Sequence, residues 1–182
     1  MSSLQGVASL LPQPYYGQVE ALWAELETDF GLKGVCVTPY PHFTWQIAPA
    51  YDLERITRTL EDIASRTAPF EISTAGLGLF NGESPVLYIP LVKTPVLTVL
   101  HQQIWQALLP ASTNPSPYYS PEQWVPHITL ACNDLTAESA GAVITRLVAR
   151  NFDWQMRVAN LFFVAVSTEG ESLTPIKVTL RG

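Results

Sequence analysis

Four stretches of the chain place apolar residues three or four positions apart, which is the spacing of one face of an α-helix. They predict helices over residues 16–30, 53–66, 95–109 and 137–150. Residues typical of helix ends support these bounds: Gly31 as a C-cap, Asp52, Thr94 and Thr136 as N-caps, and Pro95 at a first helical position. The side chains expected to face the core in the first three helices are Val19, Leu22, Trp23, Leu26, Phe30, Leu53, Ile56, Leu60, Ile63, Val96, Val99, Leu100, Ile104 and Leu108.

Other stretches alternate apolar and polar residues or are short and apolar, as strands are. In residues 42–47, Phe43, Trp45 and Ile47 are expected on the core side, and His42, Thr44 and Gln46 on the opposite side. Asn81-Gly82 predicts a hairpin turn. The strands are predicted over 4–11, 42–47, 70–80, 86–91, 127–131, 154–166 and 175–180.

Two of these strands begin with nearly the same residues. The sequence Pro-His-Phe-Thr-Trp starts at Pro41, and Pro-His-Ile-Thr-Leu starts at Pro126, 85 positions later. A loop, a helix and a further strand follow each histidine, and Leu77 and Leu161 occupy comparable places in those strands. The two halves are therefore predicted to be copies of one strand–helix–strand unit.

Within each copy a histidine and a threonine are two positions apart, so a strand presents both on one face. If the halves pack about a pseudo-two-fold axis, both pairs face one cleft. A neutral imidazole there can take a proton from water while a protonated one gives a proton to a leaving oxygen. Threonine hydroxyls can hydrogen-bond the other oxygens of a phosphate. This chemistry needs no metal.

Paired H-x-T-x motifs, here His-Phe-Thr-Trp and His-Ile-Thr-Leu, resemble those of the 2H phosphoesterase superfamily, which includes bacterial 2′-5′ RNA ligase-like proteins and cyclic nucleotide phosphodiesterases. The resemblance covers nearly the whole chain. It implies one α+β domain over residues 1–182, with two lobes of antiparallel sheet, helices outside and a central cleft. It also implies opening of 2′,3′-cyclic phosphates, or of ADP-ribose 1″,2″-cyclic phosphate, without cofactor. His42 and His127 would be catalytic, with Thr44 and Thr129 as phosphate ligands.

The composition limits the classes of binding partner that are expected. The 182 residues are 47% hydrophobic and carry a net charge of −6, which disfavours long nucleic-acid duplexes because their binding relies on neutralising phosphates. The longest apolar run is too short to cross a membrane, and the first residues lack the basic start of a secretory signal. Cys36 and Cys132 are interpreted as two buried thiols of a reducing, cytoplasmic compartment. A small nucleotide or an RNA end is the expected partner.

Residues 110–126 form a proline-rich stretch immediately before the second motif. Long loops within compact domains are often functional. We expect this loop to border the cleft and to stack on a nucleobase, although loop packing is the alternative use of its rings. The candidate stacking residues are Tyr40, Tyr118, Tyr119 and Trp124. His101, in a predicted helix beside two glutamines, is interpreted as a solvent-facing residue.

Two other functions stay open at this point. One is joining of RNA ends, which is the reverse of cyclic phosphate opening. The other is a binding module that holds a nucleotide or terminal phosphate without turnover. Histidine at both motifs disfavours the binding module, because arginine or lysine would serve binding alone.

Overall fold

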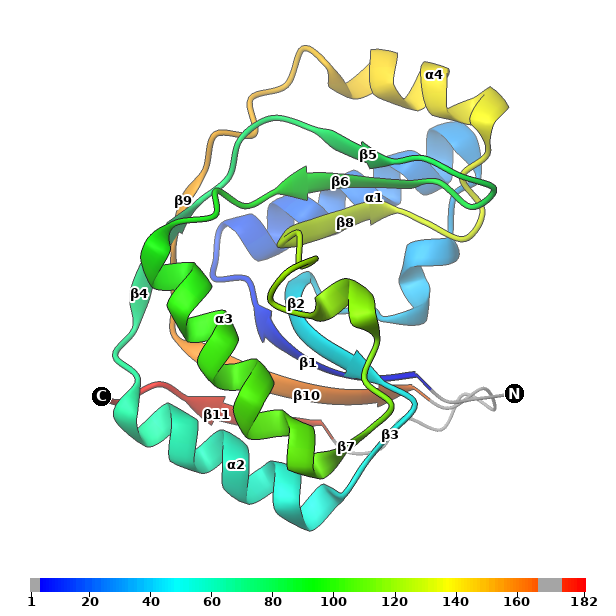
Figure 1. Cartoon of the computed structure of the whole chain (residues 1–182). Coiled ribbons are helices and arrows are strands. Elements are labelled where there is room, and N and C mark those ends of the chain that lie inside the picture. Colours follow the sequence, from blue (N-terminus) through cyan, green and yellow to red (C-terminus); the bar gives the residue numbers. More distant parts are fainter. Residues whose placement is uncertain (1–3, 167–174) are drawn as a thin grey trace.

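The computed structural model describes residues 4–166 and 175–182 as a mixture of helices and antiparallel strands (Figure 1). Four α-helices are present in these residues: α1 (Tyr15–Phe30), α2 (Leu53–Arg66), α3 (Pro95–Leu108) and α4 (Ala137–Leu147). The short 3₁₀ helices are η1 (Gly34–Val37), η2 (Leu109–Ala111) and η3 (Pro117–Tyr119). The strands are β1 (Leu4–Leu10), β2 (His42–Ala48), β3 (Ala50–Tyr51), β4 (Phe70–Ser73), β5 (Gly78–Phe80), β6 (Val86–Pro90), β7 (Ser112–Thr113), β8 (His127–Ala131), β9 (Gln155–Val158), β10 (Asn160–Val166) and β11 (Ile176–Thr179).

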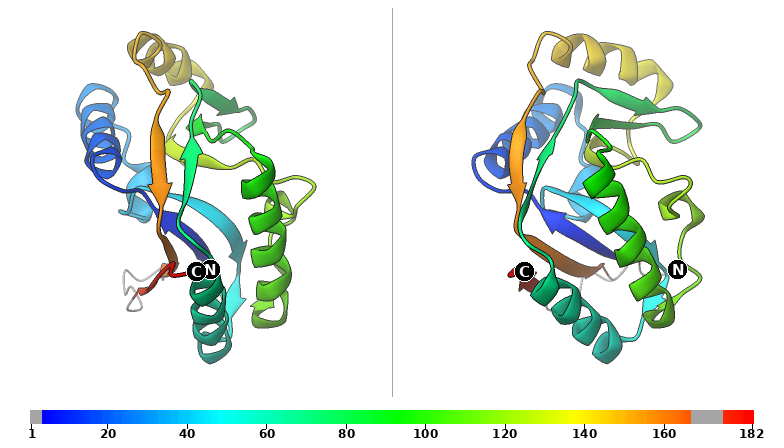
Figure 2. Two further views of the ribbon diagram at one scale, coloured as in Figure 1. Left: turned by 90° about the vertical axis from the view of Figure 1, so that its left-hand side faces the viewer. Right: turned by 60° about the vertical axis from the view of Figure 1, so that its left-hand side comes forward.

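Seven strands form one curved sheet in the order β11-β10-β1-β2-β8-β6-β5, and every neighbouring pair is antiparallel. The motif strands β2 and β8 lie side by side near its middle (Figure 1). A separate ribbon of β4 and β9 runs between the two ends of the molecule (Figure 2). The predicted α+β class with antiparallel sheets is confirmed.

The two halves correspond element by element. In chain order, β1, α1, β2, α2, β4 and β5 match β6, α3, β8, α4, β9 and β10. The pairings obey the same relation, because β2 meets its counterpart β8 and β4 meets its counterpart β9. The common sheet contains two corresponding groups of strands, β2, β1 and β10 on one side and β8, β6 and β5 on the other, so β5 and β10 each join the group of the other half. Two lobes thus meet where the repeated motifs pair.

Two predicted strands are each divided in the structure. Residues 70–80 form β4 and β5, which belong to different sheets, and residues 154–166 form β9 and β10. Gly76 lies between β4 and β5 with φ of 66°, a left-handed conformation that lets the chain turn. The same division occurs in both halves, as the repeat predicts. In each half one strand, β4 or β9, joins the ribbon, and the next strand, β5 or β10, joins the large sheet.

The predicted caps define four helix ends, whereas α4 ends at Leu147 rather than at Arg150. The side chains of Asp52, Thr94 and Thr136 accept hydrogen bonds from main-chain N–H groups in the first turns of α2, α3 and α4. Gly31 ends α1 with φ of 71°. These polar contacts satisfy groups that a helix cannot pair within itself.

The buried face of α3 differs from the prediction. Val96 and Val99 are 64% and 52% exposed, whereas the buried side chains are Leu97, Leu100, His101, Ile104, Trp105 and Leu108. The buried residues have the helical spacing that was predicted. The buried face is rotated about the helix axis relative to the prediction, since it includes His101 and Trp105. Leu53 is likewise 45% exposed at the start of α2 rather than in the core.

A β-bulge interrupts the predicted alternation of β2. The pairing of β1 with β2 skips Trp45, so this residue is the extra one. Trp45 and Gln46 are both fully buried, and Ile47 is half-buried. The prediction is therefore wrong beyond Trp45: Gln46 lies on the core side, and Ile47 lines a cavity together with His42 and Thr44.

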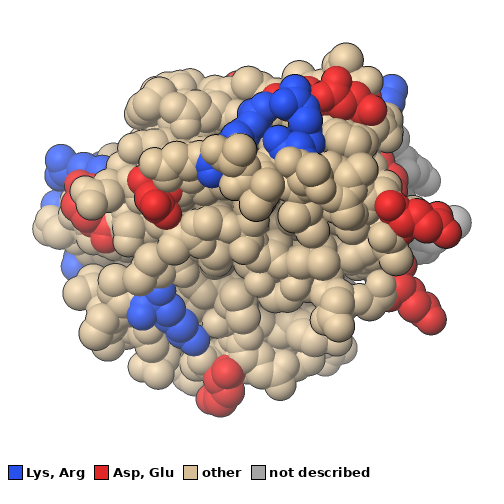
Figure 3. All heavy atoms as spheres, turned by 90° about the horizontal axis from the view of Figure 1, so that it is seen from above, with Lys and Arg blue, Asp and Glu red and all other residues tan. Residues whose placement is uncertain are grey.

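No helix among the described residues is long and apolar enough to span a membrane. On the face seen from above, basic and acidic side chains are scattered and no continuous basic band runs across it (Figure 3). Both cysteines are free, but Cys36 is exposed and Cys132 is half-buried. The interpretation of two buried thiols is wrong, because η1, which carries Cys36, contains no buried residue.

Candidate active site

The central pair of strands brings the two motifs together. Phe43 of β2 pairs with Ile128 of β8 in antiparallel register. Phe43 and Ile128 are 1% and 0% exposed and face the core. Since strand side chains alternate, the residues on either side of this pair share the opposite face of the sheet. That face therefore carries four half-buried polar side chains: His42, Thr44, His127 and Thr129.

Each imidazole is held by a main-chain carbonyl two residues before it. The Nδ1 of His127 lies 2.7 Å from the carbonyl oxygen of Val125, and the Nδ1 of His42 contacts that of Tyr40. A carbonyl oxygen only accepts, so each Nδ1 carries a hydrogen and donates it. The Nε2 atom of each ring is left for other chemistry, as in acid–base sites built on histidine.

Burial lowers the pKa of both histidines below the usual value. The carbonyl contacts of Tyr40 and Val125 oppose this effect by favouring the charged rings. A positive charge on His127 further lowers the pKa of His42. Because the repulsion between two charged rings acts on both of them, the pair favours a state in which one ring is protonated and the other is neutral.

Aromatic rings surround His127. The rings of Phe80 and Tyr88 each have their centroid 5.1 Å from that of His127. Tyr88 stacks on Phe80 at 4.2 Å, and a β-carbon at Gly78 would lie 2.4 Å from the Tyr88 ring, so glycine makes room for it. An aromatic environment can stabilise a cationic ring through cation–π attraction. Sequence reasoning missed these residues, although the predicted 81–82 turn folds Phe80 and Tyr88 toward each other.

Two tryptophan indoles donate hydrogen bonds to the main chain of the motif strands β2 and β8. Trp124 donates its Nε1 hydrogen to the carbonyl oxygen of Thr44 at 2.9 Å, and Trp23 donates to that of Thr129 at 3.1 Å. These tryptophans come from opposite halves of the chain, one from the proline-rich loop and one from α1. The two bonds give both motif threonines the same main-chain support.

Trp124 is therefore not available for stacking on a base. It is 2% exposed and lies in a stack of rings, 3.8 Å from His101 and 5.5 Å from Trp45. His101 is 1% exposed, and its Nε2 is 3.2 Å from the carbonyl oxygen of Trp45. Both predictions, of a cleft-facing Trp124 and a solvated His101, are wrong because these rings fill the space between α3 and β2.

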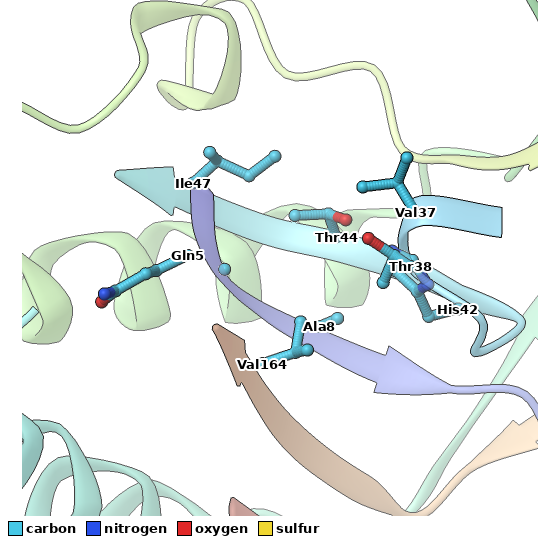
Figure 4. Close-up of a pocket in the computed structure, with 9 residues that line it drawn as sticks. Gln5, Ala8, Val37, Thr38, His42, Thr44, Ile47 and Val164 are labelled. Atoms are coloured by element: carbon cyan, nitrogen blue, oxygen red, sulfur yellow. The ribbon is translucent and has the colours of Figure 1, made fainter. Parts of the chain in front are cut away.

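A small cavity of about 70 Å³ adjoins the first motif. Figure 4 shows His42 and Thr44 extending from β2 beside Ala8 of β1 and Val164 of β10. The lining residues are Gln5, Gly6, Ala8, Val37, Thr38, His42, Thr44, Ile47 and Val164. A space of this size holds a few water molecules.

A larger cavity of about 510 Å³ adjoins the second motif. Its walls come from the β5–β6 hairpin and from the proline-rich loop. The lining residues are Phe80, Asn81, Ser84, Val86, Tyr118, Tyr119, Gln123, Val125 and His127. The loop thus borders this cavity, as expected, and brings Tyr118 and Tyr119 to it. Tyr40 instead packs against Phe162 with ring centroids 5.3 Å apart.

No group of three or more His, Cys, Asp or Glu side chains within residues 4–166 and 175–182 is arranged to hold a metal ion. The two histidines that the sequence singles out lie on the sheet without carboxylate or thiol neighbours in either cavity lining.

Paired H-x-T strands at the centre of an antiparallel sheet, backed by helices, define a class of two-lobed α+β proteins. A family model described as the 2′-5′ RNA ligase superfamily matches residues 15–169. The chain belongs to this superfamily, and the resemblance to 2H phosphoesterases is confirmed. A protein of Bacillus cytotoxicus named "Putative phosphoesterase" is 30% identical over 135 residues, which cover 72% of this chain and 73% of that protein.

Solved structures share the fold. TT0787 of Thermus thermophilus has a TM-score of 0.62 and 19% identity, with 98% of this chain and 95% of that chain covered. Escherichia coli LigT, crystallised with NADP⁺, has a TM-score of 0.60 and 15% identity, with 100% and 99% covered. Kluyveromyces marxianus Usb1 has a TM-score of 0.55 and 12% identity, with 97% and 98% covered. At these identities the likeness concerns the fold.

Proposed function

We propose that the protein hydrolyses cyclic phosphodiesters, either 2′,3′-cyclic nucleotides or ADP-ribose 1″,2″-cyclic phosphate, by acid–base catalysis without a metal. The observation that carries this proposal is the shared face of His42 and His127 on adjacent strands, each with Nδ1 bound to a carbonyl. Membership of a superfamily of RNA ligase-like proteins and phosphoesterases supports a phosphoester substrate.

The reaction is an in-line displacement at phosphorus. His42 Nε2 accepts a proton from water while the water oxygen forms a bond to phosphorus. The bond from phosphorus to one ribose oxygen breaks, and that oxygen receives the proton from His127 Nε2. The hydroxyls of Thr44 and Thr129 donate hydrogen bonds to the non-bridging oxygens and hold the phosphate between the rings. One general acid or base of this kind is worth about 100- to 10,000-fold in rate.

Two observations support His42 as the base and His127 as the acid. Phe80 and Tyr88 surround His127 with aromatic rings that suit a cation. The cavity of about 70 Å³ beside His42 fits the attacking water, whereas that of about 510 Å³ beside His127 has room for the nucleoside part of the substrate, which carries the leaving oxygen.

The larger cavity also suggests how a base is bound. Tyr118 is 76% exposed at its wall, and Tyr119 and Phe80 line it with further aromatic surface. Aromatic side chains bind nucleobases by stacking with little dependence on sequence. We assign stacking to Tyr118 and Tyr119, and none to Trp124. The free thiols of Cys36 and Cys132 fit a reducing cytoplasm.

RNA end joining is the second candidate function, because the matched superfamily is described by that activity. The same two histidines can serve it, with His42 taking a proton from a 5′-hydroxyl that attacks phosphorus in place of water and His127 protonating the ribose oxygen released from phosphorus. A module that only binds nucleotides is the non-catalytic alternative.

The test is incubation with 2′,3′-cyclic nucleotides in the presence of EDTA, followed by chromatographic product analysis. Formation of a nucleoside monophosphate is expected, and its absence together with measurable nucleotide binding would indicate the binding module. A parallel reaction supplies RNA fragments with a cyclic phosphate on one and a 5′-hydroxyl on the other. A joined product formed faster than the hydrolysed one would favour the ligase.

The assignment of roles needs a second substrate. A nucleoside phosphodiester with a nitrophenyl leaving group needs no proton donor when the bond breaks. Replacement of His127 by alanine should therefore cost little with this substrate but much with the cyclic nucleotide. Replacement of His42 by alanine should lower the rates of both reactions by similar factors. The opposite pattern would exchange the two roles.

A further inference from the structure

The two cavities beside the motifs are lined only by uncharged residues and histidine. The smaller one presents Gln5 and Thr38 as its polar residues outside the motif, and the larger one presents Asn81, Ser84 and Gln123. No Lys or Arg is found in either lining among the described residues. Phosphate groups in proteins are usually met by arginine or lysine, so this lining is informative about the ligand.

The basic residues of the chain lie outside both linings. All ten Lys and Arg fall within the described residues, so their positions can be followed. Lys33, Arg58, Arg66, Arg146 and Arg150 form ion pairs with acidic side chains. Arg55 and Lys93 donate to the carbonyl oxygens of Pro110 and Trp124. Lys177 and Arg181 line a hollow between α2 and β11, and Arg157 lies opposite Glu71 in the strand register of the β4–β9 ribbon.

The charges nearest to the larger cavity along the chain are negative. Glu83 lies in the hairpin between the wall residues Asn81 and Ser84, and it is exposed. Glu122 directly precedes the wall residue Gln123 and is exposed as well. Lys93 lies outside the lining, with its ammonium group bound to the carbonyl oxygen of Trp124. A second phosphate on a ligand in this cavity would therefore lose part of its hydration without meeting a Lys or Arg in the cavity wall, and two carboxylates adjoin that wall.

We infer that this site is selective for cyclic phosphodiesters that carry no further phosphate, such as a nucleoside 2′,3′-cyclic monophosphate with a free 5′-hydroxyl. The inference rests on the proposed function and chooses between its two substrates. The single negative charge of the cyclic phosphate is balanced by protonated His127, and the uncharged cavity takes the nucleoside. ADP-ribose 1″,2″-cyclic phosphate brings a pyrophosphate in addition, for which the lining offers no counter-charge.

Calorimetric binding gives a test that does not depend on turnover. The probes are adenosine 2′-monophosphate and adenosine 2′,5′-bisphosphate, which differ only by the 5′-phosphate. The monophosphate is expected to bind at least about tenfold more tightly to the wild-type protein, the effect of about 1.4 kcal/mol. Equal or tighter binding of the bisphosphate overturns the inference, and so does failure of both probes to bind.

A charge added to the cavity wall makes the test specific. In Gln123→Lys the preference for the monophosphate should fall at least about threefold, because the new ammonium group can meet the 5′-phosphate. Gln103→Lys adds the same charge on the exposed side of α3 and is the matched control. An equal change in both variants would mean that net charge, rather than the cavity, sets the preference, and would overturn the inference.

Turnover separates this inference from the proposed function. Wild-type protein should hydrolyse adenosine 2′,3′-cyclic monophosphate at least about tenfold more efficiently than its 5′-phosphorylated form or ADP-ribose 1″,2″-cyclic phosphate. Equal kcat/KM values for the three substrates overturn the selectivity while leaving the phosphodiesterase intact. Absence of turnover with all three refutes the proposed function, and the binding comparison then decides the selectivity alone.

Discussion

The indole of Trp124 donates a hydrogen bond of 2.9 Å to the main-chain carbonyl of Thr44, a residue 80 positions earlier in the first motif. Trp23 makes the equivalent contact with Thr129 at 3.1 Å. A buried carbonyl that finds no partner in the sheet is costly, and the β2 bulge next to Thr44 disturbs the regular ladder there. Each indole therefore both satisfies a main-chain group and fixes the strand that carries a catalytic candidate.

Replacing Trp124 with phenylalanine should weaken this support. The variant keeps an aromatic ring but leaves the Thr44 carbonyl without its donor, which costs about 1–3 kcal/mol in the free energy of unfolding. We expect lower kcat with a smaller change in KM, measured with a cyclic nucleotide, because the strand positions reacting groups. The control is Trp105→Phe, which changes another buried tryptophan, located in α3. Equal losses of kcat in the two variants would show that the indole bond has no special role.

Alanine at His42 or His127 should lower turnover of a cyclic nucleotide by about 100- to 10,000-fold, the usual contribution of one acid or base. Valine at Thr44 or Thr129 should cost less, about 10- to 150-fold, since each removes one hydrogen bond to an anion, worth about 1.5–3 kcal/mol. Thr145→Val, on the exposed face of α4, should leave the rate unchanged. Full activity in either His→Ala variant would remove that ring from the mechanism.

The pH profile of kcat/KM should be bell-shaped, with its maximum below about pH 6.5. Activity requires neutral His42 and protonated His127, and burial lowers the pKa of both rings. The rate should fall at low pH as His42 gains a proton, and at higher pH as His127 loses one. Initial rates measured from about pH 4 to about pH 9 give the profile. A maximum above about pH 7.5 would be incompatible with these two groups in the free enzyme.

His101 should make the fold sensitive to acid. Burial lowers its pKa to about 4, while its bond to the Trp45 carbonyl opposes the shift; nearby Lys93 lowers the pKa and Glu122 raises it. Below about pH 6.5 the unfolded chain binds a proton at this position that the folded chain does not. The stability is complete above that pH and is lost as pH falls toward 4, by up to about 3 kcal/mol.

Urea unfolding of wild type and His101→Phe at about pH 7 and about pH 4.5 measures this effect. The phenylalanine variant should lose less stability between the two pH values than the wild type, because one buried titrating group is gone. His42 and His127 are present in both proteins, so their contribution cancels in the comparison. An identical loss in the two proteins would show that His101 does not titrate as expected.

The sequence was sufficient for the elements that repeat. Two H-x-T motifs in the same order of helix and strand predicted paired strands, and the structure has Phe43 beside Ile128 in the middle of one sheet. The helix caps followed from local rules, because Asp52, Thr94 and Thr136 act within their own first turns.

Errors arose where distant parts of the chain meet. No local pattern indicates that β1 skips Trp45, and this bulge moves Gln46 into the core. His101 is polar and flanked by glutamines, yet it is buried because it stacks on Trp124, 23 residues later in the chain. The sequence likewise contains no local signal that Trp124 is buried, so it predicts this ring at the cleft. Loop aromatics can fill the core or border a cavity, and only the tertiary fold separates Trp124 from Tyr118.

The central claim is that both motifs act on one phosphate. A crystal structure of the protein with a bound nucleoside 2′-monophosphate tests it most directly. We predict phosphate oxygens within about 3 Å of Nε2 of both His42 and His127 and of both threonine hydroxyls, with the nucleobase in the cavity lined by Phe80 and Tyr118. A phosphate that contacts only one histidine, or that binds away from β2 and β8, would contradict it.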